Sequence, residues 1–154
     1  MDKCVAIIPA RGGSKRILRK NIKDFLGKPL IAYSVQTALE SKLFDKVIVT
    51  TDDEEIAAIA RKYGAEVPFI RPKELADDFT GTGDVVKHAI GWLKENNEEE
   101  FDYLCTIYAI VPSLQEKCLI EGFRKLKESN AYIAFSVTSM PFLIQRTFKI
   151  TEDE

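Results

Sequence analysis

The fold of this chain is decided by Val5-Ala6-Ile7-Ile8-Pro9-Ala10-Arg11-Gly12-Gly13-Ser14-Lys15, an apolar run that ends in a basic, glycine-containing loop. Apolar runs rich in β-branched residues are typical of buried strands, so residues 3–8 are predicted to form one. The loop that follows places two glycines among cationic and hydroxyl side chains. A loop of this composition at the end of a buried strand indicates a site for a small anion.

This loop has the composition that a polyphosphate requires. We expect Gly12 and Gly13 to adopt positive φ angles, so that consecutive backbone N–H groups approach the anion closely. Arg11 supplies a planar fork of donors, and Lys15 and Lys20 supply mobile point charges. Neither the P-loop pattern nor the dinucleotide-binding pattern of glycines occurs in the chain. The alternative is that the basic loop only keeps the end of the strand solvated.

Strand and helix patterns alternate along nearly the whole chain. This alternation predicts an α/β fold with a mostly parallel sheet and helices on both faces. Residues 142–150 are predicted to begin either another strand or an excursion from the domain. The predicted strands are residues 3–8, 47–51, 66–70, 103–107 and 132–137. The predicted helices are residues 29–39, 52–63, 115–129 and a fourth that Asp84 caps and that runs to about residue 95.

Composition limits the classes of protein to consider. A chain of 154 residues with 45% hydrophobic content predicts one domain over residues 1–154. The net charge of −2, with acidic and basic residues interleaved, argues against nucleic acid as a partner. Three cysteines without C-x-x-C spacing predict reduced, buried thiols. With neither a signal-peptide layout nor a membrane-spanning run, the chain is predicted to be cytoplasmic and away from membranes.

Five segments that together span most of the chain follow one family pattern. They are residues 8–15 (IPARGGSK), 20–21 (KN), 44–53 (FDKVIVTTDD), 63–76 (YGAEVPFIRPKELA) and 107–115 (IYAIVPSLQ). These segments resemble the acylneuraminate cytidylyltransferases, enzymes that make CMP-activated nonulosonic acids of the sialic type. Residues 79–82 (FTGT) and 136–142 (SVTSMPF) are similar to the branch of that family that activates pseudaminic acid.

The resemblance implies both a fold and a reaction. The fold is that of the Rossmann-like nucleotide-diphospho-sugar transferases. The reaction joins CTP to a nonulosonic acid, pseudaminic or sialic in type, and releases pyrophosphate, with Mg²⁺ as the cofactor. A homodimer is implied for the full-length protein. The resemblance also implies that the family's domain and its metal-binding aspartates continue beyond Glu154, so the metal ligands stay unknown here.

Thirteen residues are candidates for the functional site, and Tyr108 among them stands where sialic acid members of the family more often carry a glutamine. Arg71 and Thr82 fall where the family reads cytosine, with the alternative that Arg71 only caps a strand end. Lys20 falls where a partner of the α-phosphate is expected. The catalytic set is Arg11, Lys15 and Lys20. The nucleotide-binding set is Ala10, Gly12, Gly13, Ser14, Asn21, Arg71 and Thr82. The sugar-binding set is Tyr108, Gln145 and Arg146, the last two with the alternative of simple loop surface.

Two further groups invite a chemical role. Asp52 and Asp53 offer the carboxylate oxygens that Mg²⁺ prefers, but acidic residues at a helix N-terminus are favoured by capping and by the helix dipole. We therefore predict capping for this pair. His88 is the one histidine of the chain and is predicted to be a packing or surface residue rather than a base.

Two other functions stay open on the sequence. One is a nucleotidyltransferase that acts on another class of sugar acid. The other is a module that binds a nucleotide without turning it over.

Overall fold

The computed structural model describes residues 2–97 and 100–138 of the chain. Backbone contacts divide the chain into two units, Met1–Glu121 and Gly122–Glu154. The sheet and the candidate site lie in the first unit. That the whole chain forms one domain stays a prediction.

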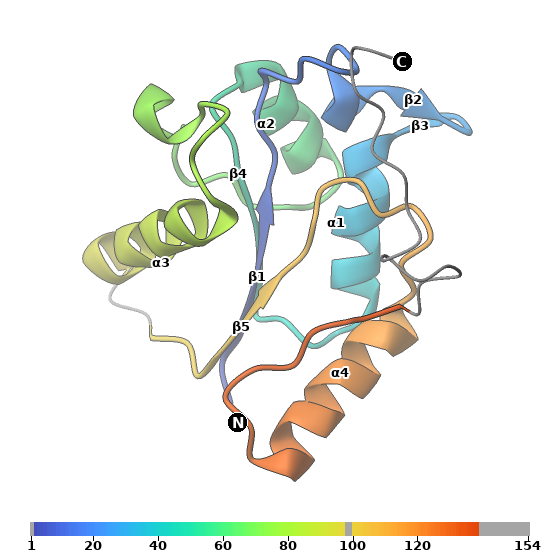
Figure 1. Ribbon diagram of the computed structural model, residues 1–154, viewed down its shortest axis with the longest axis vertical. Coiled ribbons are helices and arrows are strands. Elements are labelled where there is room, and N and C mark those ends of the chain that lie inside the picture. The colour runs from blue at the N-terminus through green and yellow to red at the C-terminus, as the bar shows by residue number, and fades with distance from the viewer. Residues whose placement is uncertain (1, 98–99, 139–154) are drawn as a thin grey trace, which may run out of the picture. The chain divides into compact units, whose positions relative to one another are not determined.

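A three-stranded parallel sheet forms the centre of the first unit (Figure 1). Its middle strand is β1 (Cys4–Pro9), with β4 (Lys46–Thr50) on one side and β5 (Tyr103–Thr106) on the other. Ile8 pairs with Val49 and Ile7 pairs with Thr106. The opening apolar run is therefore the central strand, and the loop after it emerges at the middle of the sheet's carboxyl edge.

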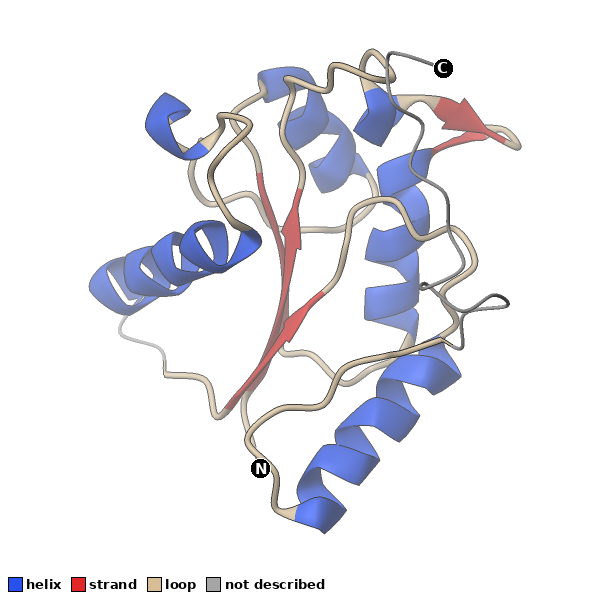
Figure 2. Ribbon diagram, in the orientation of Figure 1, coloured by secondary structure: helices blue, strands red, loops and turns tan. Residues whose placement is uncertain are grey.

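Side chains of β1 alternate between two apolar layers, as the period of a strand requires. Ala6 and Ile8 pack with α1 (Leu30–Glu40) and α2 (Glu54–Lys62). Val5 and Ile7 pack with α3 (Thr82–Asn97), which lies on the other face of the sheet (Figure 2). Helices cover both faces, so the predicted α/β fold is confirmed.

Short elements connect this framework. The 3₁₀ turns are η1 (Lys20–Ile22) and η2 (Lys73–Leu75), and β2 (Asp24–Phe25) and β3 (Lys28–Pro29) form a small antiparallel hairpin. This hairpin was not predicted from the sequence. Its turn uses positive φ angles at Leu26 and Gly27, of 51° and 82°. The last helix is α4 (Glu116–Ser129).

Two predicted boundaries differ from the structure. The strand expected over residues 66–70 is reduced to two isolated parallel bridges, Ile48 with Glu66 and Thr51 with Ile70. Asp84 does not cap α3, because the helix begins two residues earlier, at Thr82. The backbone carbonyl of Gly81 already accepts the N–H groups of Asp84 and Val85, so Asp84 lies inside the first turn.

The strand predicted over residues 132–137 is wrong. The structure assigns no strand there, and Tyr132, Ile133 and Phe135 are exposed. An alternating apolar pattern forms a strand only when a neighbouring strand accepts its backbone hydrogen bonds. The prediction for residues 142–150 lies outside the described residues.

The cysteines and the histidine have ordinary environments. None of the three cysteines forms a disulfide, but only Cys4 is buried, and Cys118 is exposed, against the prediction. Burial raises the pKa of the half-buried Cys105 thiol to about 11. The ring of His88 lies edge-on to Phe69, with 5.1 Å between centroids, as a packing residue does. In the part of the chain that the structure covers, no helix is both long and apolar enough to cross a bilayer.

Candidate functional site

A cavity of about 530 Å³ opens at the carboxyl end of β1. Its walls come from the loop after β1, the segment from Arg71 to the start of α3, and the loop after β5. In open parallel sheets ligands bind outside the carboxyl ends of the strands, which is where this cavity lies. Seven of the sequence-predicted site residues line it: Arg11, Ser14, Lys20, Asn21, Arg71, Thr82 and Tyr108.

Backbone hydrogen bonds hold the loop after β1. Ala10 continues the sheet by donating its N–H to the Thr50 carbonyl at 3.0 Å, and its side chain is buried. The Ser14 N–H turns back to the Gly12 carbonyl at 2.9 Å. The buried side chain of Asn21 donates to the Arg11 carbonyl at 2.8 Å. Ala10 and Asn21 therefore fix the two ends of the loop against the framework.

Gly12 is required for close approach and not for an unusual backbone angle. Positive φ occurs at Gly27 and Gly64 but at neither glycine of the loop, so the expectation for Gly12 and Gly13 is wrong. A Cβ at Gly12 would lie 2.7 Å from Oδ2 of Asp53 and 3.0 Å from its Cβ. A Cβ at Gly13 would meet nothing within 4 Å. The loop packs directly on Asp53, and only Gly12 needs to be glycine for that contact.

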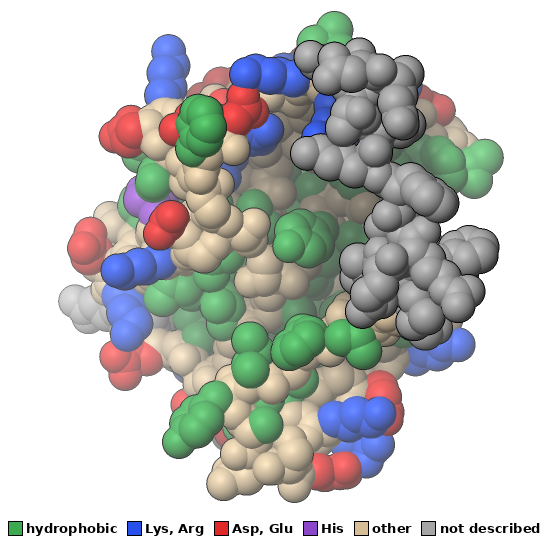
Figure 3. All heavy atoms as spheres, in the orientation of Figure 1, with side chains coloured by type: hydrophobic (Ala, Val, Ile, Leu, Met, Phe, Trp, Pro, Cys, Tyr) green, Lys and Arg blue, Asp and Glu red, His purple; other side chains and the backbone are tan. Residues whose placement is uncertain are grey.

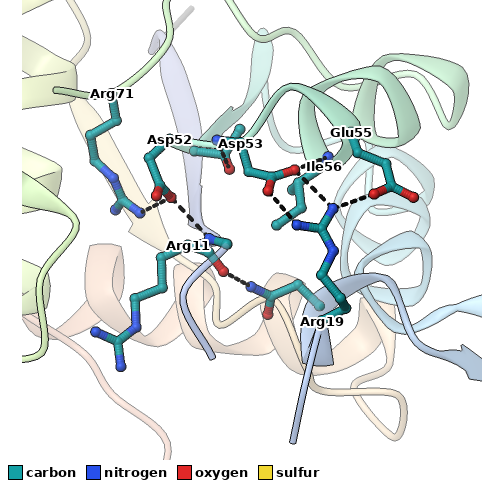
Figure 4. Close-up of polar contacts among 10 residues, drawn as sticks. Arg11, Arg19, Asp52, Asp53, Glu55, Ile56 and Arg71 are labelled. Carbon is teal, nitrogen blue, oxygen red and sulfur yellow. Dashed lines mark hydrogen bonds and ion pairs between the residues drawn. The ribbon is translucent and has the colours of Figure 1, made fainter. Parts of the chain in front are cut away.

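Asp53 anchors this contact from the start of α2. Its side chain caps the helix by accepting the Ile56 N–H at 3.0 Å, which confirms the predicted capping role. It also receives both terminal nitrogens of Arg19, one of them at 3.0 Å, and Arg19 pairs in addition with Glu55 (Figure 4). The hydrogen bonds from Arg19 are the main cause that lowers the pKa of Asp53, and the same pair raises the pKa of Arg19.

Asp52 does not cap the helix and turns toward the cavity wall instead. Its Oδ1 accepts the Gly12 N–H at 2.9 Å. The same oxygen lies 3.6 Å from Nη2 of Arg71, an ion pair too long to be a hydrogen bond. Figure 4 shows the two side chains facing each other. The link from Asp52 to the loop was not predicted from the sequence, because the two residues that it joins are far apart along the chain.

Arg71 is a buried cation whose side chain is 3% exposed. Its backbone N–H donates to the Thr51 carbonyl at 2.7 Å, which fixes the residue at the sheet's edge. Burial is the main cause that lowers its pKa, and Asp52 opposes that shift. Among the described residues, Nε and Nη2 have no hydrogen-bond partner. Arg71 thus lines the cavity with a buried guanidinium that keeps two donors without a hydrogen bond in the described part of the chain.

Arg11 and Lys15 converge on one carboxylate. Arg11 donates to the Asp77 carbonyl and pairs with Asp78 at 2.7 Å, and the ammonium group of Lys15 contacts the same Asp78 side chain. The hydrogen bond from Lys15 is the main cause that lowers the pKa of Asp78, and the hydrogen bond from Arg11 is the next. The two cations do not point apart but share an acidic partner beside the cavity. Two adjacent acidic residues in the aperiodic loop after residue 70 were the sequence signal for this contact.

The remaining predicted residues are less constrained. Tyr108 is 68% exposed and lines the cavity, while its carbonyl accepts the Ser34 hydroxyl at 2.9 Å. Thr82 lines the cavity as the first residue of α3. Ala10, Gly12, Gly13 and Lys15 support the loop without lining the cavity. Gln145 and Arg146 lie outside the described residues.

Charge around the site is local. Among the described residues drawn in Figure 3, Lys and Arg side chains lie among Asp and Glu side chains and form no continuous basic surface. The described residues contain no group of three or more His, Cys, Asp or Glu side chains that could hold a metal ion. Asp52 and Asp53 are both engaged in contacts within the protein.

A parallel sheet with helices on both faces and a basic loop at the carboxyl edge of its central strand defines an open α/β domain, a class in which ligands bind outside the carboxyl ends of the strands. A CMP:2-keto-3-deoxy-manno-octonic acid synthetase solved with CTP shares this fold, at a TM-score of 0.70 and 22% identity over 84% of this chain and 49% of that one. The sequence profile of the cytidylyltransferases matches residues 5–151. The chain belongs to the cytidylyltransferase family, which confirms the family that the sequence resembles.

Curated relatives refine the comparison. A pseudaminic acid cytidylyltransferase of Campylobacter jejuni is 46% identical over 151 residues, which cover 98% of this chain and 65% of the relative. An N-acylneuraminate cytidylyltransferase of Escherichia coli is 50% identical over 88 residues, which cover 57% of this chain and 21% of that protein. The chain thus spans about two thirds of the length of the first relative.

Proposed function

We propose that this chain carries the nucleotide site of a pseudaminic acid cytidylyltransferase. In the proposed reaction a hydroxyl oxygen of the sugar acid attacks the α-phosphorus of CTP. The bond to the β-phosphate breaks, pyrophosphate leaves, and the hydroxyl proton is released. The observation that carries the proposal is the cavity at the carboxyl edge of β1, lined by seven residues of the expected site. The 46% identity to the Campylobacter enzyme supports the choice of sugar acid.

The phosphate end of the proposed site is the loop after β1. Arg11 and Lys15 already hold a carboxylate between them, so they have the spacing to hold phosphate oxygens in its place. Lys20 lines the same cavity and is our candidate for the α-phosphate. Phosphoryl transfer depends mainly on positioning and on charge neutralisation, which fixed cations supply. Ser14 adds a hydroxyl that donates or accepts.

The base end of the proposed site is Arg71 with Thr82 and Asn21. Arg71 carries open donors, and the hydroxyl of Thr82 donates or accepts. Cytosine presents two acceptors, O2 and N3, where uracil presents an N3–H donor. An arginine fork therefore favours cytosine over uracil, since a buried donor facing another donor is left unpaired.

Of the three candidates for the sugar end of the proposed site, Tyr108 lies within the described residues. Tyr108 is exposed at the cavity and has room to contact the sugar acid. Gln145 and Arg146 stay candidates for its carboxylate, because arginine binds a carboxylate bidentately. Mg²⁺ stays the expected cofactor, although the described residues contain no group of three or more side chains that could hold it. A homodimer stays the expectation for the full-length protein.

The test measures pyrophosphate release from CTP in the presence of pseudaminic acid. In separate reactions N-acetylneuraminic acid replaces pseudaminic acid, UTP replaces CTP, or Mg²⁺ is omitted. We expect release with CTP and pseudaminic acid, and none when UTP replaces CTP or Mg²⁺ is omitted. Nucleotide affinity is measured in parallel by calorimetry. CTP binding without release would favour a nucleotide-binding module over an enzyme. Absence of both would remove the proposed function.

A further inference from the structure

Asp52 connects two walls of the cavity that are far apart in the sequence. Its Oδ1 accepts the backbone N–H of Gly12 at 2.9 Å, from the loop after β1. The same oxygen lies 3.6 Å from Nη2 of Arg71. The carboxylate of Asp52 therefore contacts both the loop after β1 and the buried guanidinium of Arg71 (Figure 4).

Arg71 has an opposite charge nearby but no hydrogen bond to it. A guanidinium that is 3% exposed needs an opposite charge nearby, because an unpaired buried charge is strongly disfavoured. Asp52 supplies that charge at a distance too long for a hydrogen bond. Nε and Nη2 of Arg71 stay without a hydrogen-bond partner among the described residues. Buried donors are nearly always bonded, and Nε faces no charged partner in the described part of the chain either, so the guanidinium of Arg71 indicates an acceptor on a ligand in the cavity that it lines.

We propose that Asp52 is a positioning residue for base recognition. It compensates the charge of Arg71 while leaving the donors of the guanidinium free for the O2 and N3 acceptors of cytosine. By holding Gly12 with the same oxygen, it also sets the distance between the base end and the phosphate end of the site. This inference rests on the proposed function, since it assumes that a cytidine nucleotide occupies the cavity.

Two substitutions at Asp52 separate its two contacts. Asp52→Asn keeps the shape of the side chain and an Oδ1 acceptor for Gly12, but it removes the charge that faces Arg71. Asp52→Ala removes both contacts. We expect Asp52→Asn to lower the preference for CTP over UTP roughly 10-fold while UTP affinity changes little. Asp52→Ala weakens the binding of both nucleotides.

The experiment measures the affinities of CTP and UTP by calorimetry on the whole chain. Glu54→Gln is the matched control, because Glu54 is an exposed acidic residue two positions along and lies outside the set that lines the cavity. It should keep the preference of the unaltered protein. Arg71→Lys keeps the charge but loses the planar fork, so it should lose the CTP preference as Asp52→Asn does. Asp52→Glu restores the charge and should recover part of the preference.

The outcomes separate this inference from the proposed function. A chain that binds neither nucleotide removes the proposed function itself. A chain that prefers CTP and keeps that preference in Asp52→Asn overturns the role of Asp52. Equal weakening of CTP and UTP in Asp52→Asn assigns Asp52 a structural role only. If Asp52→Asn does not fold, an Arg71→Lys variant that still prefers CTP overturns the inference.

Discussion

Gly12→Ala tests the contact between the anion-binding loop and the start of α2. The new Cβ would lie 2.7 Å from Oδ2 of Asp53 and 3.0 Å from its Cβ, so the two groups cannot keep their positions. Asp53 cannot rotate away freely, because it caps α2 through the Ile56 N–H and binds Arg19. Loss of an N-cap costs about 0.5–2 kcal/mol, and overpacking costs about 1–3 kcal/mol. We expect Gly12→Ala to lower the free energy of unfolding by about 2 kcal/mol.

The assay is urea and thermal unfolding followed by circular dichroism. A loss of about 2 kcal/mol corresponds to a fall of roughly 4–8 °C in the melting temperature of a chain of this length. Gly13→Ala is the matched control, because a Cβ there meets nothing within 4 Å. It should change the free energy of unfolding by less than about 0.5 kcal/mol, or raise it slightly. Equal effects of the two substitutions would refute the packing argument.

Two further predictions concern carboxylates of the site. Asp53→Asn keeps the N-cap but removes the charge, so it should lose about 0.5–1 kcal/mol of stability at pH 7. Because the pKa of Asp53 is lowered in the folded protein, that stabilisation exists above the unfolded pKa and is lost as pH falls through the folded value. In urea titrations the difference in stability between the two proteins should therefore begin to shrink below about pH 4 and vanish below the folded pKa, and a gap that stays constant from pH 7 down to pH 3 would contradict the pairing. Asp78→Asn removes the carboxylate that competes for Arg11 and Lys15, so CTP should bind more tightly than in the control Glu74→Gln. Unchanged or weaker CTP binding, measured by calorimetry, would show that Asp78 does not compete with the nucleotide.

The central strand and its loop could be predicted because their signals are local. A run of β-branched residues identifies β1 by composition alone, and the basic loop directly follows it. The acidic start of α2 also identified Asp53 as a cap, since capping acts over three residues. These features depend on neighbours in the sequence, which a pattern can register.

The contacts that assemble the cavity could not be predicted in the same way. Asp52 meets Gly12 and Asp78 meets Arg11 only because separate loops converge at one edge of the sheet. Gly12 was expected to be special for its φ angle, whereas its constraint comes from the side chain of Asp53. Tertiary packing decides such contacts, and local periodicity carries no signal for it.

The most direct test of the nucleotide site is the affinity of CTP for the double variant Arg11→Ala, Lys15→Ala. The matched control removes two exposed lysines outside the cavity, Lys62→Ala with Lys87→Ala. Calorimetry should show CTP binding to the unaltered chain and to the control, and a loss of at least about 100-fold in the double variant. CTP affinity that survives the loss of both cations would contradict the assignment of this loop to the triphosphate.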